Sequence, residues 1–166
     1  MKRTALIILV ALFLSALFPI STVFGECLTG DCQNGVGVFK YPDGSIYDGP
    51  FKNGLRHGQG SLKVPGGLEY TGEFEENEIQ GRGILVLPNG TRYEGEFQKG
   101  ERQGQGTMTF SDGGIYKGTF KDDEINGVGA YTPANGSFQY EGEWKDGKAN
   151  GRGVIKLPNG ARYEGE

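Results

Sequence analysis

The stretch Tyr93–Gly113, YEGEFQKGERQGQGTMTFSDG, decides the fold because its pattern returns along the chain every 23 residues. A tyrosine opens each copy, a glycine follows two residues later, and an aromatic residue follows four residues after the tyrosine in five copies. The opening residues are Tyr47, Tyr70, Tyr93, Tyr116, Tyr140 and Tyr163, and one step, the one before Tyr140, is 24 residues long. A fixed period of this length indicates stacked structural units, each of which contacts its neighbours.

The same period places most of the glycine. The 166 residues include 31 glycines, nearly 19% of the chain, where about 7% is usual. Twenty-four of them fall at four positions of the unit, which are 2, 11, 13 and 20 residues after the tyrosine. Collagen is excluded because a strict Gly-X-Y period is absent and only 7 residues are proline. The 10 Phe, 8 Tyr and 1 Trp argue against a disordered linker, since linkers contain few large rings.

Each unit is predicted to be a β-hairpin. In the unit that opens at Tyr93, the first strand is Tyr93–Phe97, the turn is 98–103, and the second strand is Gly104–Phe110. Turns such as 87–92 (LPNGTR) join the units, and their Asn-Gly or Asp-Gly steps supply the positive φ that tight turns require. The extra residue in 132–139 is expected to enlarge a loop or form a bulge. The predicted fold is all-β: an elongated, twisted, single-layer antiparallel meander of hairpins, preceded by an N-terminal hydrophobic signal helix.

Alternation predicts that the sheet has two different faces. Tyrosine, glycine and the second aromatic residue share even positions of the first strand and point to one side, the ring face. Glu94, Glu96 and Gln98 point to the other side, the polar face. A large ring lies flat across a strand only where its neighbours on the same face have no side chain, which gives the strand glycines a role.

Residues 1–25 are predicted to be a signal peptide or an uncleaved membrane anchor. Lys2 and Arg3 precede an apolar stretch, Ala5–Phe18, which ends at Pro19, and this is the order of a secretory signal. The apolar run is also near the lower length limit of a membrane-spanning helix. Either interpretation predicts an exported protein that is periplasmic, extracellular or membrane-anchored.

The exported part is divided into two segments. Residues 26–46 are predicted to form a Cys-containing cap with a partial repeat, and residues 47–166 to form five repeats and a terminal half-strand unit. Cys27 and Cys32 are expected to form a disulfide, because they lie close together in a chain bound for an oxidising compartment. A lipoprotein is disfavoured, because Glu26 stands where lipoprotein signals have a small residue. Two thiols and a distant histidine do not complete a zinc site.

The charge balance excludes one class of partner. The chain carries 17 Lys plus Arg and 21 Asp plus Glu, a formal net charge of −4. Without Lys2 and Arg3 the balance is 15 against 21, or −6. Such a surface repels nucleic acid and has no general attraction for anionic lipid.

The pattern predicts no catalytic site. His57, the sole histidine, occupies a turn position that holds Gln or Asn in the other units. Ser61, Ser111 and Ser137 occupy non-equivalent positions, and a nucleophile requires a positioned base and oxyanion donors. A phosphate-binding loop of the GxxxxGK[ST] type is absent. We therefore expect a non-enzyme with no cofactor, no metal and no small-molecule substrate.

Carboxylates form two columns on the polar face. The first column contains Asp48, Glu94, Glu141 and Glu164, and the second contains Glu73, Glu96, Glu143 and Glu166. Strands of the same type lie roughly 9.6 Å apart, which is too far for successive carboxylates to share one calcium ion. Arg82 and Arg152, on intervening strands, are expected to pair with them. The columns are interpreted as a solvated charge ladder that discourages sheet stacking.

The units resemble MORN (membrane occupation and recognition nexus) repeats, which look like YxGxF-x-x-G-x-x-x-G-x-G followed by an apolar strand and PxG. Tyr93–Gly113 and Tyr140–Gly160 carry the pattern nearly position for position, and the resemblance covers about residues 33–166. Pro50 departs from it where an acidic residue is usual. The resemblance, to a bacterial-type exported MORN repeat protein, implies an elongated sheet for binding and scaffolding, in some members near membrane phospholipid, with catalysis confined to other domains.

The ring face leaves two interpretations open. Either the rings are the core of the fold, or part of the face is a groove for a protein segment or a glycan. The candidate binding residues are Tyr70, Phe74, Tyr93, Phe97, Tyr116, Phe120, Tyr140 and Trp144. A protein partner or an oligomeric assembly is expected first, a phospholipid surface is the alternative, and cell-wall polysaccharide is a weaker one.

Overall fold

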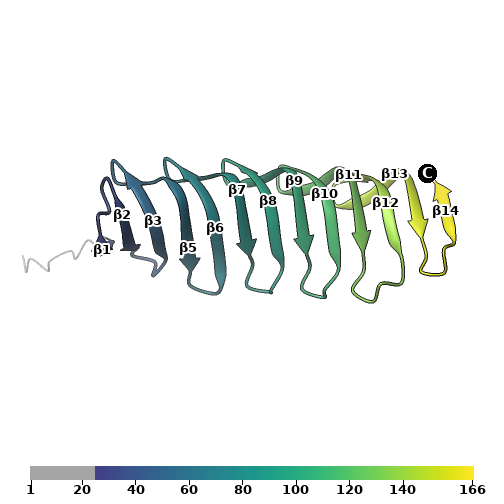
Figure 1. The fold of residues 1–166 in the computed structure, drawn as a ribbon, viewed down its shortest axis with the longest axis horizontal. Helices are drawn as coiled ribbons and strands as arrows, with labels where there is room; N and C mark the ends of the chain where they lie inside the picture. Colours follow the sequence, from purple (N-terminus) through teal and green to yellow (C-terminus); the bar gives the residue numbers. More distant parts are fainter. Residues whose placement is uncertain (1–24) are drawn as a thin grey trace, which may run out of the picture.

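The chain forms one row of antiparallel strands. A computed structural model describes residues 25–166, and the predicted signal segment lies outside them apart from Gly25. The strands follow one another along a single elongated sheet from the N-terminal to the C-terminal end (Figure 1). They are β1 (Glu26–Gly30), β2 (Val36–Lys40), β3 (Ile46–Lys52), β4 (Leu55–Arg56), β5 (Gly58–Val64), β6 (Leu68–Glu75), β7 (Glu78–Val86), β8 (Arg92–Gln98), β9 (Glu101–Thr109), β10 (Ile115–Lys121), β11 (Glu124–Thr132), β12 (Gln139–Lys145), β13 (Lys148–Lys156) and β14 (Arg162–Gly165). The predicted all-β antiparallel meander is confirmed. Residues 25–166 contain no helix that is long and apolar enough to span a membrane.

The turn inside each unit is shorter than predicted. In the hairpin of β8 and β9, only Lys99 and Gly100 are unpaired, and both have positive φ (53° and 85°), as a two-residue turn of type I′ requires. The prediction of a turn over 98–103 was wrong, because Gln98 pairs with Glu101 across this tight turn. Units 1 to 5, named from their opening residues Tyr47, Tyr70, Tyr93, Tyr116 and Tyr140, all have such a turn.

A bulge compensates for the short turn. In unit 3, Gly95 pairs with Gly106 while Glu96 pairs with Gln103, so Gly104 and Gln105 are extra residues on β9. Gly104 has a φ of 64°, which favours glycine. The Glu96 carboxylate lies over Gly104, where a Cβ would collide with it. In unit 4, Thr119 stands at the position of Glu96, and its Oγ1 accepts a hydrogen bond from the Val128 amide (2.9 Å).

Unit 1 departs from this arrangement because of proline. Pro50 stands where units 2, 3 and 5 have glutamate, and the second strand is divided into the short β4 and β5. The Pro50 carbonyl accepts from the His57 amide (3.0 Å) across the interruption. The residue that departs from the family pattern therefore changes the strand locally and leaves the row of units intact.

The connecting turns hold the register between units. In the turn before β8, Gly90 donates to the Leu87 carbonyl (2.9 Å), and the Thr91 amide donates to Asn89 Oδ1 (2.9 Å). Gly90 has a φ of 86°, whereas Asn89 does not have a positive φ, so glycine alone supplies it. In unit 4 the longer segment becomes a wider loop, and β11 pairs with β12 without a shift in register.

Two columns of rings form the core on the ring face. Each of the four fully buried tyrosine rings packs edge-to-face on the aromatic residue of its own unit and on that of the next unit; for Tyr70 the centroids lie 5.1 Å from Phe74 and 5.2 Å from Phe97. The ring lies over two glycines, and a Cβ built at Gly83 would come within 2.6 Å of Tyr70 Cζ. The glycines are therefore where the flat-ring prediction requires them.

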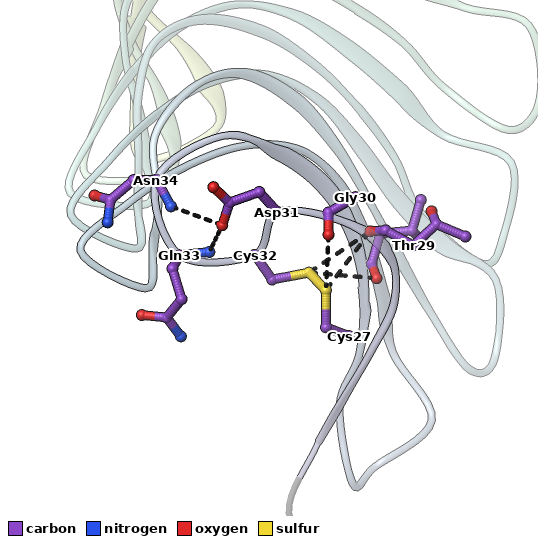
Figure 2. Close-up of a disulfide and its surroundings, with 8 residues drawn as sticks. Cys27, Thr29, Gly30, Asp31, Cys32, Gln33 and Asn34 are labelled. Atoms are coloured by element: carbon purple, nitrogen blue, oxygen red, sulfur yellow. Dashed lines mark hydrogen bonds between the residues drawn. A yellow bond between two sulfur atoms is a disulfide. The ribbon is translucent and has the colours of Figure 1, made fainter.

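A disulfide closes the N-terminal end of the row. Cys27 and Cys32 are joined, and Figure 2 shows the bond beside a turn in which Asp31 Oδ1 accepts from the amides of Gln33 (2.8 Å) and Asn34 (3.1 Å). Cys32 is buried under β2, where a Cβ at Gly37 would lie 2.8 Å from its sulfur. The bond places the edge strand β1 against the first turn.

Candidate binding surfaces

The predicted ring-face site is largely an interior. Tyr70, Phe74, Tyr93, Phe97, Tyr116 and Phe120 are buried, each with no more than 4% of its surface exposed. These six rings are the core, so the interpretation of them as an exposed groove does not fit their burial. Tyr140 and Trp144 are half-buried in unit 5, because only a partial unit packs on their C-terminal side. The accessible part of the ring face is therefore concentrated near unit 5.

The buried tyrosine hydroxyls have structural partners. The hydroxyl of Tyr93 donates to the Glu96 carbonyl (2.9 Å), and the equivalent bond from Tyr47 reaches the Pro50 carbonyl (3.1 Å). Burial raises the pKa of Tyr47 and of Tyr93 to about 12, so both are neutral donors at neutral pH. An activated tyrosine would require the opposite shift, and these hydroxyls serve the fold.

An open groove crosses the polar face. It has a volume of about 510 Å³ and runs over β5–β10 along the line of strand glycines. Its side chains include Thr71, Arg82, Ile84, Glu94 and Lys117. Glycine backbone forms the floor, so the groove presents both peptide groups and side chains of either charge. Two further open hollows, of about 420 and 520 Å³, follow the same face toward the N-terminal and C-terminal ends.

Apolar side chains on the polar face were missed by the prediction of a charged surface. Val36 and Val128 are each 65% exposed, and Ile46 and Ile115 are also exposed. They occupy positions of the repeat that hold charged or polar residues in other units, such as Arg82. Comparison of these positions between units would have revealed them. The polar face therefore combines exposed apolar groups with charges of both signs.

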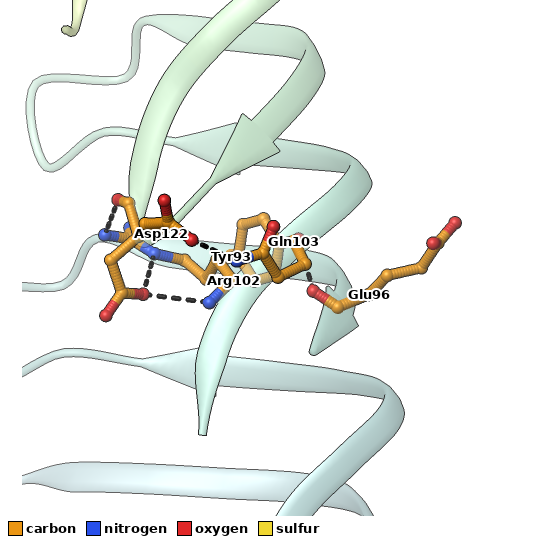
Figure 3. A network of polar contacts seen from close by, with 6 residues as sticks. Tyr93, Glu96, Arg102, Gln103 and Asp122 are labelled. Carbon is orange, nitrogen blue, oxygen red and sulfur yellow. Dashed lines mark hydrogen bonds and ion pairs between the residues drawn. The ribbon is translucent and has the colours of Figure 1, made fainter. Parts of the chain in front are cut away.

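Turns of successive units contact one another at the side of the sheet. Arg102 donates from its amide and Nε to Asp123 Oδ1 (both 2.9 Å), and its Nη2 donates to the Asp123 carbonyl. Gln103 Nε2 donates to Asp122 Oδ1 (2.7 Å), beside Arg102 (Figure 3). The Arg102 guanidinium also lies 5.8 Å from the ring centres of Tyr93 and Phe120. This arginine ties two units together and covers their rings.

The predicted charge ladder is found in part. Arg152 pairs with Glu166 (3.1 Å), as expected, whereas Arg82 uses its backbone amide to reach Glu73 Oε1 (3.3 Å). Glu73 bends over the bulge glycine of its unit. Within the described part of the chain, no three His, Cys, Asp or Glu residues are grouped as a metal site would require.

Comparisons with known proteins identify the repeat. The family model described as "MORN repeat" matches residues 33–46, 47–68, 70–92, 93–115, 116–138 and 140–162. A search of curated protein sequences found no match.

Two solved structures are among those that the chain matches. One is the TCP domain of SAS-4 from Drosophila melanogaster in complex with a proline-rich motif of Ana2; it is 17% identical, the TM-score is 0.46, and the alignment covers 100% of this chain and 98% of that chain. Another is the TCP10 domain of Danio rerio CPAP in complex with a STIL peptide; it is 18% identical, the TM-score is 0.24, and the alignment covers 77% of this chain and 66% of that chain.

Proposed function

We propose that this chain, which belongs to the MORN repeat family, is a non-catalytic, exported protein-binding and scaffolding module of the bacterial type. The groove of the polar face carries the proposal. The six buried core rings are not available to a partner, whereas this groove combines length, open access and mixed chemistry. A polypeptide in extended conformation presents alternating side chains and peptide groups that suit such a surface.

The groove is better suited to protein than to an anionic membrane. Arg82 and Lys117 line it together with Glu94, and the chain as a whole carries a net charge of −4. Juxtamembrane lysine and arginine contribute roughly 1 kcal/mol each to binding of anionic lipid, and two such cations beside one carboxylate, on an acidic chain, provide little of that contribution. Apolar Val128 and Ile115 supply area that a protein partner would bury.

Site-specific photocrosslinking tests the groove. A photoreactive phenylalanine analogue at Thr107, inside the groove, is compared with the same residue at exposed Glu69 on the polar face outside it. In the native host, we expect Thr107 to give a discrete polypeptide adduct that Glu69 does not give and that Ile84→Glu removes. Equal adducts from both positions, or an adduct insensitive to Ile84→Glu, would refute the use of this groove.

Flotation separates the lipid alternative. The full chain is mixed with vesicles of neutral phosphatidylcholine and with vesicles that contain anionic phosphatidylglycerol. We expect no salt-sensitive enrichment with the anionic vesicles. Tight, salt-sensitive binding would replace the protein-binding proposal with a membrane-surface function.

Export is part of the proposal. The order of Lys2, Arg3, the apolar stretch and Pro19 supports it, and so does the Cys27–Cys32 disulfide, because such bonds persist in oxidising compartments. Fusion of alkaline phosphatase after Glu166 is expected to give an active, oxidised enzyme in the host. An inactive fusion that becomes active in a control with a known signal peptide would contradict export.

A further inference from the structure

A pocket opens on the ring face between units 3 and 5. It has a volume of about 380 Å³, and its walls include Phe110, Tyr131 and Trp144 above Ile125. The Tyr131 ring centre lies 6.0 Å from that of Phe110 and 6.3 Å from that of Trp144. Ile125 is buried, whereas Asp112 is exposed at the rim. The site is thus a cup of three rings with a carboxylate beside it.

The equivalent place in unit 1 is filled by the chain itself. There the Arg56 guanidinium lies 5.7 Å from the ring centre of Tyr41, 6.0 Å from that of Tyr47 and 5.2 Å from that of Phe74. Its Nη2 donates to the Asn77 carbonyl (2.6 Å). A guanidinium is therefore a group that this ring arrangement accommodates, and three rings favour a cation by their negative faces.

Five repeat positions match between the two places, whereas the third ring of the cup, Tyr131, stands where unit 1 has Leu62. The unit 4 counterparts of Tyr41, Tyr47, Arg56, Phe74 and Asn77 are, in the same order, Phe110, Tyr116, Ile125, Trp144 and Gly147. The backbones agree as well. Asn77 donates to the Arg56 carbonyl (3.1 Å), Gly147 donates to the Ile125 carbonyl (3.0 Å), and the two donors have φ values of 75° and 74°. Unit 4 therefore keeps the aromatic surroundings and the turn but has no arginine.

The other units do not leave this place open in the same way. Unit 3 has its own Arg102, which lies over Tyr93 and Phe120. Unit 2 has Ile79, like unit 4, but Val64 stands where unit 4 has Phe110. Only in unit 4, among the four units with a buried tyrosine, does an aromatic wall coincide with the loss of the internal cation.

A carboxylate adds charge complementarity. Asp112 Oδ1 accepts from the Gly114 amide (2.8 Å), which holds the side chain in the turn that forms the rim. A carboxylate has acceptor capacity beyond that one bond. A Cβ at Gly114 would meet both the Tyr131 hydroxyl (2.8 Å) and Asp112 Oδ1 (3.2 Å), so the hydroxyl and the carboxylate lie on the same side of the cup.

We propose that the cup of Phe110, Tyr131 and Trp144 binds the guanidinium of an arginine that belongs to a polypeptide partner, in the place that Arg56 fills in unit 1. Guanidinium suits the cup better than an ammonium group, because it is planar, stacks on rings and is more weakly hydrated. The Gly147 carbonyl is positioned as the acceptor that corresponds to that of Asn77. This site is on the ring face and is independent of the polar-face groove.

Trp144 is the sole tryptophan, so its fluorescence reports the cup directly. The full chain is titrated with the peptide acetyl-Gly-Gly-Arg-Gly-Gly-amide and with the same peptide carrying citrulline, an uncharged isostere of arginine. We expect saturable binding of the arginine peptide and roughly 2- to 30-fold weaker binding of the citrulline peptide. Equal affinities, or no saturable response to arginine, would refute the proposal. Tighter binding of a trimethyllysine peptide would assign the cup to quaternary ammonium groups instead.

Two matched variants locate the binding. Ile125→Arg with Gly147→Asn rebuilds the internal arrangement of unit 1, and we expect it to abolish the response because the new side chain occupies the cup. Asp112→Asn keeps the oxygen that accepts from Gly114 and removes the charge, and an approximately threefold loss is expected. Asp43→Asn is the control, since Asp43 forms the same turn contact with Ser45 (2.9 Å) at the place Arg56 already fills.

The variants remain informative separately. If the double variant fails to fold, the affinities of Asp112→Asn and Asp43→Asn for the arginine peptide still test the site. Equal losses of affinity in these two variants would refute the assignment of the cup. If the folded double variant still gives the polypeptide adduct in the polar-face groove, that result supports the proposed function independently of the cup. The two proposals therefore fail by different results.

Discussion

Replacement of Gly83 by alanine tests whether the glycines exist to seat the tyrosine rings. Gly83 has an ordinary strand conformation, so alanine is not excluded by the backbone. Its new Cβ, however, would lie 2.5 Å from Tyr70 Cε2 and 2.6 Å from Cζ, whereas real Cβ atoms essentially never lie closer than 3.0 Å to such neighbours. Tyr70 is fully buried and packed edge-to-face on Phe74 and Phe97, so the ring has nowhere to retreat without loss of contact.

The expected cost follows from these contacts. Overpacking of a dense core costs typically 1–3 kcal/mol. The displaced hydroxyl would also lose its bond to the Glu73 carbonyl (3.1 Å), which contributes about 0.5–1.5 kcal/mol. Alanine recovers roughly 0.5–1 kcal/mol of backbone entropy relative to glycine. We therefore expect Gly83→Ala to lower the free energy of unfolding by about 0.5–4 kcal/mol.

A double-mutant cycle isolates the ring as the cause. Tyr70→Leu shortens the side chain, so in that background Gly83→Ala should be neutral or slightly stabilising, with a coupling energy of about 2 kcal/mol or more. Gly165→Ala is the control, because Gly165 occupies a ring-facing position of the terminal unit and a Cβ there meets nothing within 4 Å. Urea unfolding is followed by circular dichroism and by Trp144 fluorescence. Additive effects of Gly83→Ala and Tyr70→Leu would refute the explanation.

Three further predictions concern other contacts. Burial raises the pKa of Tyr47 and Tyr93 from 10.0 to about 12, so the stability that their neutral hydroxyls contribute is complete below pH 10 and should be lost as the pH rises to about 12. Tyrosinate absorbance and urea midpoints measure this loss. Ionisation of both tyrosines at the same pH as in the unfolded chain would contradict it. Arg102→Ala breaks the pair with Asp123 and uncovers two rings, so it should lower the free energy of unfolding by about 1–3 kcal/mol. Arg162→Ala, in an exposed pair with Glu164, is the control and should lower it by roughly 0.5 kcal/mol or less. Urea midpoints measure both, and equal losses would count against the role of Arg102. The double variant Cys27→Ser, Cys32→Ser opens a small closed loop that contributes up to about 2 kcal/mol to stability. We expect faster amide hydrogen exchange in β1 and β2, with exchange in β8 and β9 unchanged. Equal acceleration along the whole chain would contradict a local effect of the disulfide.

The repeat period predicted the fold because the spacing of tyrosine and glycine determines which face of the sheet each residue occupies. A tyrosine and a glycine two residues apart must share a face of a strand, and the 23-residue period repeats that relation until the sheet is complete. Tyr70 and Gly83 therefore meet as expected, although they lie on different strands. The hairpin boundary was not predicted correctly, because a turn at Lys99 and Gly100 followed by a bulge at Gly104 uses the same residues as one longer turn. The choice depends on positive φ at Lys99, and lysine does not signal this conformation.

The surfaces were harder to predict than the core. Hydrophobicity predicts that rings prefer burial, but in a single-layer sheet the sequence contains no second layer to bury them. The structure resolves this through edge-to-face contacts between neighbouring units and through coverage by residues such as Arg102. These contacts depend on which units are adjacent. The half-buried state of Trp144, at the last complete unit, follows from the same dependence.

Variation between units is where this chain differs from a uniform repeat. Units 1 and 3 have arginine before the bulge, followed in the next unit by Asn77 or Asp123, while units 2 and 4 have isoleucine, followed by Gly100 or Gly147. The partner residue changes together with the arginine because the guanidinium and the arginine amide bond to it. Loss of the arginine therefore removes a cation and its acceptor side chain together, yet keeps the backbone bond between the turns. A place occupied by an internal cation in one unit can thus be open to an external cation in another without disturbance of the sheet. Two positions, Val64 and Leu85 in unit 2 against Phe110 and Tyr131 in unit 4, then decide whether aromatic walls remain to bind it.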